Sequence, residues 1–112
     1  MTSASRKARS RESEFTVALA LQRVFPDAVA VASALSGKDI LNTPGVAVEV
    51  KSRRDLRLPE WLKQASRNAG LETPVVIHRP DGFGPKTVLD WPVTMTMNHF
   101  MALLEEAGYG SE

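Results

Sequence analysis

The chain of 112 residues contains no cysteine and only two histidines, His78 and His99. Without cysteine, neither a disulfide framework nor a thiolate metal site can form. Two histidines are also too few for a zinc site built from histidine. Any metal that this chain binds must therefore be held mainly by oxygen ligands.

Long apolar runs are missing as well. The N-terminal stretch "MTSASRKARSR" has no apolar core of the kind found in secretory signals, and no run approaches the roughly 20 apolar residues of a membrane span. We therefore expect a cytoplasmic protein with no membrane partner, located in the host cytoplasm if a phage encodes it. The length suits one small domain with a single core.

Strong net charge is the third absence, since the formal net charge is only +1. Taken alone, that value argues against a nucleic-acid partner. The distribution is uneven, however: residues 1–67 hold 12 Lys and Arg against 7 Asp and Glu, whereas residues 68–112 hold 2 against 6. A basic first half of this kind is typical of a surface that contacts a polyanion.

The first half begins with residues that have little to bury. Residues 1–11 are mainly Ser, Arg and Lys, so we expect a basic, flexible N-terminal arm, or at most the first turn of a helix. Residues 12–112 are then expected to form a single domain. Over 12–25, apolar residues recur at helical spacing, and Pro26 ends the predicted helix.

Six further elements are predicted from periodicity and turn residues. Small and β-branched residues over 28–35 indicate a strand before an "SGKD" turn, and strict alternation over 46–52 gives the clearest strand. The others are a helix over 58–70, a short buried strand over 73–80, an edge strand over 86–94 that contains Pro92, and a helix over 95–108. This order predicts an α/β sandwich with a central mixed sheet flanked by helices.

The clearest strand carries charges on one face. Val46, Val48 and Val50 alternate with Glu49 and Lys51. Burying such charges costs several kcal/mol unless they are paired or ligated. If Asp39 ends the preceding strand, a tight connection brings its carboxylate beside that of Glu49. Two carboxylates and a backbone carbonyl are the hard oxygen ligands that Mg²⁺ or Mn²⁺ prefers.

The pattern in "DILNTPGVAVEVK" resembles the core of the PD-(D/E)XK nuclease superfamily. The resemblance covers about residues 12–80, where the predicted order of elements is also similar. The small size, the glutamate in the first helix and the Gly-x-Asp turn look most like Holliday-junction resolvases of the archaeal and phage type. The resemblance implies a restriction-endonuclease-like fold.

The same resemblance implies a set of site residues. Carried over to this chain, the catalytic residues are Glu14, Asp39, Glu49 and Lys51. Glu14 shares a side with the predicted buried stripe of the first helix, and Glu12 is the alternative. A glutamine in the helix after the E-x-K pair is also common in the superfamily. Gln64 matches that position and is the last catalytic candidate.

The resemblance further implies which groups hold the metal. The ligands would be Asp39, Glu49 and the carbonyl of Val50, with Glu14 completing the outer coordination and Lys51 orienting the attacking water. The archaeal resolvases also use a serine near the turn, for which Ser33 and Ser36 are weak matches. The motif departs from its name because Lys38, not proline, precedes Asp39.

Basic residues cluster directly after the E-x-K pair. In "KSRRDLR", Arg53, Arg54 and Arg57 are expected to contact DNA phosphates, although such a run is more often a solvated face, and Arg54 with Asp55 is more simply a local ion pair. The other candidate phosphate contacts are Arg9, Arg11, Lys38 and Arg79. The aromatic side chains and His78 are expected to pack in the core or at an interface.

The expected activity is metal-dependent hydrolysis of phosphodiester bonds in DNA, at four-way junctions formed in recombination. Two symmetric cuts require two sites, so a homodimer is expected, with the apolar helix over 95–108 as part of its interface. The alternatives are another structure-selective, restriction-type or repair-type nuclease of the superfamily and a DNA-binding module without catalysis. An E-x-K pair alone is a weak signal, since it is usually the solvent face of a strand.

Overall fold

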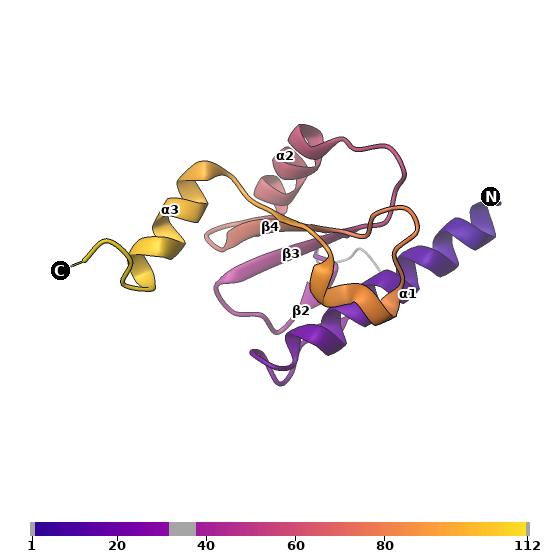
Figure 1. Cartoon of the computed structure of the whole chain (residues 1–112), viewed down its shortest axis with the longest axis horizontal. Coiled ribbons are helices and arrows are strands. Elements are labelled where there is room, and N and C mark those ends of the chain that lie inside the picture. Colours follow the sequence, from indigo (N-terminus) through magenta and orange to yellow (C-terminus); the bar gives the residue numbers. More distant parts are fainter. Residues whose placement is uncertain (1, 32–37, 112) are drawn as a thin grey trace.

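The computed structural model describes residues 2–31 and 38–111 (Figure 1). Its longest helix, α1, spans Ser3–Leu21 and therefore includes most of the predicted flexible arm. The side chain of Thr2 caps the helix by accepting a hydrogen bond from the Ser5 amide. The arm is helical because it holds no Gly or Pro after this cap, and because its Ala, Arg and Lys residues favour helix. The C-terminal end lies at Leu21, four residues before the predicted one.

A mixed sheet forms the centre of the molecule, as predicted. Strand β3 (Val46–Lys51) pairs in parallel with β4 (Thr73–His78), with Val46 opposite Thr73 and Lys51 opposite His78. β4 also pairs antiparallel with the short strand β5 (Val93–Thr94), which gives the order β3-β4-β5. The predictions of strands over 46–52 and 73–80 are thus confirmed.

A second, smaller ladder precedes β3. Strand β1 (Val29–Ala30) pairs antiparallel with β2 (Ile40–Leu41), which directly follows Asp39. The predicted strand over 28–35 begins as expected, whereas residues 32–37, with Ser33 and Ser36, lie outside the described residues.

Helix α2 (Leu58–Ala69) is the predicted second helix, with Pro59 in its first turn and Gly70 after its end at φ 60°. Only glycine adopts such a backbone conformation readily, which explains the stop. Parallel strands need a long crossover connection so that the second strand can start at the same end of the sheet as the first. Helix α2 provides this crossover between β3 and β4.

The predicted edge strand over 86–94 was wrong for most of its length. Residues Pro85–Asp90 form a 3₁₀ helix, η2, and only Val93–Thr94 pair with β4. Pro85 starts this helix with its fixed φ. The turn then delivers Trp91 into the core, where the ring is 4% exposed. Burial of the indole explains why a helical turn replaced the strand.

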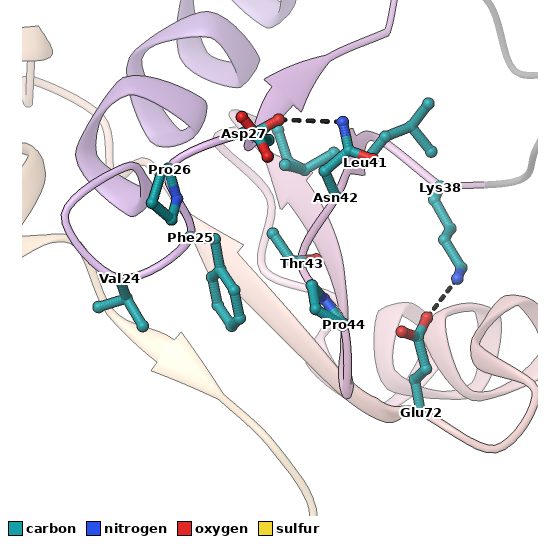
Figure 2. Close-up of a pocket in the computed structure, with 11 residues that line it drawn as sticks. Val24, Phe25, Pro26, Asp27, Lys38, Leu41, Asn42, Thr43, Pro44 and Glu72 are labelled. Carbon is teal, nitrogen blue, oxygen red and sulfur yellow. Dashed lines mark hydrogen bonds and ion pairs between the residues drawn. The ribbon is translucent and has the colours of Figure 1, made fainter.

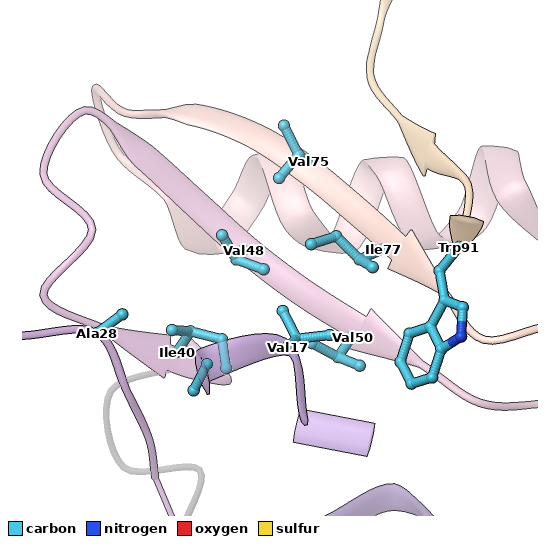
Figure 3. Packing of buried hydrophobic residues seen from close by; sticks show 9 residues of the cluster. Val17, Ala28, Ile40, Val48, Val50, Val75, Ile77 and Trp91 are labelled. Carbon is cyan, nitrogen blue, oxygen red and sulfur yellow. The ribbon is translucent and has the colours of Figure 1, made fainter. Parts of the chain in front are cut away.

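The two main helices cover opposite faces of the sheet (Figure 1). On one face, Val17 of α1 packs with Val48, Val50 and Ile77, and Trp91 closes the cluster (Figure 3). On the other face, Trp61 and Ala65 of α2 pack against Val76. The molecule is therefore a sandwich of helix, sheet and helix over the described residues.

Helix α3 (Met97–Glu106) is the predicted last helix, capped by Thr96, whose hydroxyl accepts from the His99 amide. It extends beyond the sheet at the end opposite the N-terminus (Figure 1) and has no buried residue. Among the described helices, α3 included, none has the length and apolar character needed to span a bilayer.

Candidate active site

The outer edge of β3 carries the first part of the site. The amide of Val50 donates a hydrogen bond of 2.7 Å to Oδ2 of Asp39. The carbonyl of the next residue, Lys51, points the other way and accepts from the Arg79 amide beyond β4. Because successive peptide groups of a strand alternate in direction, the Val50 carbonyl lies at the same edge as Asp39. Asp39 is thus fixed beside the Val50 carbonyl.

The charged face of β3 is covered by polar side chains of α2. The Asn68 amide donates to Oε1 of Glu49 at 3.2 Å, and Nζ of Lys51 donates to Oε1 of Gln64 at 3.1 Å. Gln64 and Asn68 lie four residues apart and therefore on one side of the helix. Glu49 is only 6% exposed. An E-x-K pair usually lies on the solvent-exposed face of a strand, but here the face that carries Glu49 is buried against α2.

These groups meet at one cavity of about 250 Å³. Every predicted catalytic residue borders it, as does Val50. The complete lining consists of Ser10, Glu14, Lys38, Asp39, Glu49, Val50, Lys51, Ser52, Arg53, Gln64 and Asn68.

The structure distinguishes between the two acids of the first helix. Glu14 borders the cavity, whereas Oε1 of Glu12 pairs with Nη1 of Arg79 at 2.7 Å, away from the cavity. Two residues along a helix rotate a side chain to a different face, so one of the pair faces the site and the other does not. Glu14 is therefore the acid of α1 that belongs to this site.

The carboxylates of the site affect one another strongly. Burial raises the pKa of Glu49 to about 7, and the neighbouring Asp39 adds to the rise by its charge and by hydrogen bonding, against opposing contributions from Asn68 and Lys51. Burial also raises the pKa of Glu14 to about 7, with the Asp39 charge as the second cause. Lys51 and Arg11 lower the pKa of Glu14 but do not offset this rise. Burial in the cavity therefore opposes the ionisation of both glutamates, and the neighbouring Asp39 adds to the effect.

The chemistry of these donors fits a hard divalent cation. Carboxylate and carbonyl oxygens suit Mg²⁺ and Mn²⁺, and a cation between Asp39 and Glu49 would offset both the burial and the Asp39 charge that raise the pKa of Glu49. Within residues 2–31 and 38–111, no three Asp, Glu or His side chains form a group that could hold a metal by themselves. The Val50 carbonyl would supply a third oxygen donor beside Asp39 and Glu49.

The predicted phosphate-binding residues lie in different surroundings. Arg53 borders the cavity and is exposed. Arg54 pairs with Asp81 at 3.3 Å, not with its neighbour Asp55, and Arg57 pairs with Glu60 at 3.6 Å. Both pairs are well exposed, so they hold these arginines only weakly. The loop after β3 therefore presents three exposed arginines, of which Arg53 borders the cavity.

Three further basic residues lie around the same cavity. Arg11 is exposed on α1, next to Ser10, which borders the cavity. The half-buried Arg9 donates to the carbonyls of Ser52 and Pro80 and thereby ties α1 to the loop after β3. Lys38 borders the cavity and pairs with Glu72.

Arg79 does not fit the predicted role of a phosphate contact. Its side chain is 6% exposed, donates to Glu12, Ser13 and the Phe83 carbonyl, and stacks over the ring of Trp91 at 5.6 Å. A guanidinium paired and buried in this way joins α1 to the end of β4. Its position after a strand gave no signal of this burial.

A larger cavity of about 940 Å³ lies elsewhere, between the end of α1 and the segment around β2 (Figure 2). Its lining includes Phe25, Leu41 and Pro44, and Lys38 with its partner Glu72 borders one side. None of the acids of the candidate site faces it. Size alone therefore does not indicate where the chemistry takes place.

Three residues of the smaller cavity were not predicted from the sequence: Ser10, Ser52 and Asn68. Asn68 had a usable signal, because it follows Gln64 by four residues and so shares its helix face. The two serines had none, since their hydroxyls meet at 3.4 Å only when α1 crosses the loop after β3.

Comparison of the chain with protein-family models, with curated proteins and with solved structures found no match. The residues of the cavity are therefore the basis for any functional conclusion.

Proposed function

We propose that this protein is a metal-dependent DNA endonuclease with a PD-(D/E)XK core, and that its substrate is a four-way junction. The observation that carries the proposal is the convergence of Glu14, Asp39, Glu49 and Lys51 on one cavity, from three separate segments of the chain. The order of helix, strands, helix and strand around them is compatible with that core.

The residues of the chain divide the chemistry among themselves. A divalent ion held by Asp39, Glu49 and the Val50 carbonyl would supply charge stabilisation for the scissile phosphate. The Val50 amide fixes the carboxylate of Asp39. Lys51, held by Gln64, orients the attacking water and contacts the phosphate. Glu14, which borders the same cavity from α1, would complete the outer coordination of the ion.

The surroundings of the cavity support a polyanionic substrate. Arg53, Arg54 and Arg57 stand on the loop that leaves the site, and Arg11 stands on the adjoining turn of α1. Arginine side chains at such positions neutralise phosphates and release counterions on binding. We infer that the DNA backbone crosses the site between this loop and α1.

A junction cut symmetrically requires a second copy of the site, and we propose a homodimer. Helix α3 supports a role in this contact, because Met97, Phe100 and Met101 are exposed on a helix with no buried residue. A ten-residue helix is marginal in water without a packing partner. Light scattering on the whole chain measures the mass directly.

The test of function is cleavage of matched DNA substrates. A four-way junction, a flap and a linear duplex of the same sequence are incubated with the protein in Mg²⁺ or in EDTA, beside the Asp39→Asn variant. We expect paired cuts in the junction, dependent on Mg²⁺ and absent from the variant. Equal cutting of all three substrates would instead indicate a restriction-type or repair-type nuclease. Binding without cutting in Mg²⁺ or Mn²⁺ would overturn the proposed catalysis.

A further inference from the structure

Asn68 is the residue of the cavity with the most specific unexplained contact. It lies in the last turn of α2, is half-buried, and borders the cavity. Its side-chain amide donates to Oε1 of Glu49 at 3.2 Å. Helix positions of this kind are usually solvated, so a contact with a buried carboxylate calls for a reason.

The contact matters because Asn68 is an amide donor to Glu49, whose other side-chain hydrogen bond is with Asp39, itself a carboxylate. The terminal torsion of a glutamate is broad, and its carboxylate therefore has no fixed orientation of its own. Glu49 is 6% exposed, so water has little access to hold it. A donor on one oxygen selects one orientation of the carboxylate and leaves its other oxygen available to a cation.

The type of side chain at position 68 is also informative. The amide supplies a hydrogen-bond donor without positive charge, whereas a lysine or arginine would neutralise Glu49 and compete with a cation. One turn earlier, Gln64 makes the equivalent contact with Lys51. The same side of α2 therefore holds both members of the E-x-K pair, each through an amide.

We propose that Asn68 is a positioning residue that holds the carboxylate of Glu49 in place for a divalent cation. The effect on cation binding depends only on the carboxylate site, and the effect on DNA cleavage rests on the proposed function. Outer partners of metal ligands of this kind typically change metal affinity or activity by about 10-fold to 100-fold when they are removed.

The first experiment measures Mn²⁺ binding by the whole chain without DNA, using calorimetry and the loss of the free Mn²⁺ resonance signal. We expect Asn68→Ala to weaken Mn²⁺ binding by about 10-fold or more. Asn68→Leu, which has similar volume and no donor, should show the same loss, and Asn68→Gln should recover part of it. Arg67→Ala, on the exposed side of the same helix, serves as the matched control and should bind Mn²⁺ like the wild type.

A second readout separates positioning from folding. Circular dichroism and thermal unfolding show whether each variant is folded, and junction binding in EDTA should be unchanged, because Asn68 has no phosphate contact assigned to it. Unaltered Mn²⁺ affinity in folded Asn68→Ala and Asn68→Leu would overturn the inference. If the wild type binds Mn²⁺ and Asn68→Ala binds it weakly, the inference stands even where no DNA is cut. If the wild type binds no Mn²⁺, both the inference and the proposed function fail.

Discussion

The two faces of β3 are buried to a similar degree and differ in chemistry, because one is apolar and the other carries Glu49 beside Ala47. Val48 is 2% exposed on the face toward α1, and Glu49 is 6% exposed on the face toward α2. Burial of the valine stabilises the fold, whereas burial of the glutamate raises its pKa to about 7 and so opposes its ionisation. The strand therefore buries a charge almost as deeply as apolar surface, on the face that borders the candidate site.

Helix α2 repeats this division along its own surface. Trp61 and Ala65 pack on Val76 of β4, whereas Gln64 and Asn68 contact the charged residues of β3. One helix thus packs apolar side chains against β4 and polar side chains against β3. The change from apolar to polar packing between β4 and β3 marks the border of the candidate site.

The largest effect is expected when a ligand carboxylate on the charged side is neutralised. Asp39→Asn or Glu49→Gln should abolish junction cleavage, because each removes a charge needed to capture the cation, while junction binding stays nearly intact. Gel-shift titration and cleavage of the same labelled junction measure the two properties separately. A variant that cuts at the wild-type rate would exclude that residue from the site.

Lys51→Ala should reduce cleavage by orders of magnitude and leave Mg²⁺ or Mn²⁺ binding intact, since the ammonium group is assigned to water and phosphate. Single-turnover cleavage gives the rate, and calorimetry gives the metal affinity. Gln64→Ala is the matched comparison and should lower the rate less, because it removes only the acceptor that holds Lys51. A large loss of metal affinity in Lys51→Ala would show that the role assigned to Lys51 is wrong.

Stability should respond in opposite directions on the two faces. Val48→Ala should cost about 2 kcal/mol of unfolding free energy, from lost burial and the cavity left behind, and should not change the cleavage rate per folded molecule. Glu49→Gln in EDTA should be more stable than the wild type at pH 8. Urea unfolding of the three proteins measures both effects.

The pH dependence follows from the sign of the shift. The pKa of Glu49 is about 7 when folded and 4.5 as a model value, so the folded state binds the proton more tightly. The contribution of Glu49 to the free energy of unfolding is therefore fully present below pH 4.5. It is lost as the pH rises through 7, and the total loss is up to about 3 kcal/mol. The advantage of Glu49→Gln should grow over that window. An advantage that is the same at pH 4.5 and pH 8 would contradict the assigned burial of charge.

The sequence predicted the features that depend on local pattern. Alternation gave β3, Pro59 and Gly70 gave the limits of α2, and the spacing of Asp39, Glu49 and Lys51 predicted residues that do border one cavity. These signals are local because side-chain period and backbone restrictions act within a few residues.

The features that failed depend on tertiary packing. Apolar and polar residues alternate poorly over 86–94, but several of the side chains favour strands. The chain forms a 3₁₀ helix there instead, because this turn brings Trp91 into the core. The low apolar content of residues 1–11 favours a flexible arm, but these residues belong to α1 from Ser3 onward. Tertiary contacts are the reason, because Arg9 donates to the carbonyls of Ser52 and Pro80. The choice between Glu12 and Glu14 depended on Arg79, which is 67 residues away from Glu12 in sequence.

The smallest effect is expected on the loop that continues the charged side of β3, where Arg53 borders the cavity and Arg54 and Arg57 do not. Replacing Arg53, Arg54 and Arg57 together with alanine should flatten the log–log dependence of junction affinity on salt by roughly two to three units, at about 0.9 per phosphate contact. The exposed pairs of Arg54 with Asp81 and Arg57 with Glu60 are too weak to prevent these contacts. Binding titrations at several salt concentrations give the slope.

The control removes the same charge from exposed positions that do not border the cavity, Arg23, Arg67 and Lys86. If net charge alone attracted the DNA, both triple variants would flatten the slope equally. If the loop holds the backbone, only the first does so, and it weakens junction and duplex alike because phosphate contacts read no sequence. An unchanged slope in the first variant would move the DNA surface onto α1, around Arg9 and Arg11. The metal site would then stand without its neighbouring loop, because neither Asp39 nor Glu49 depends on those arginines for its position.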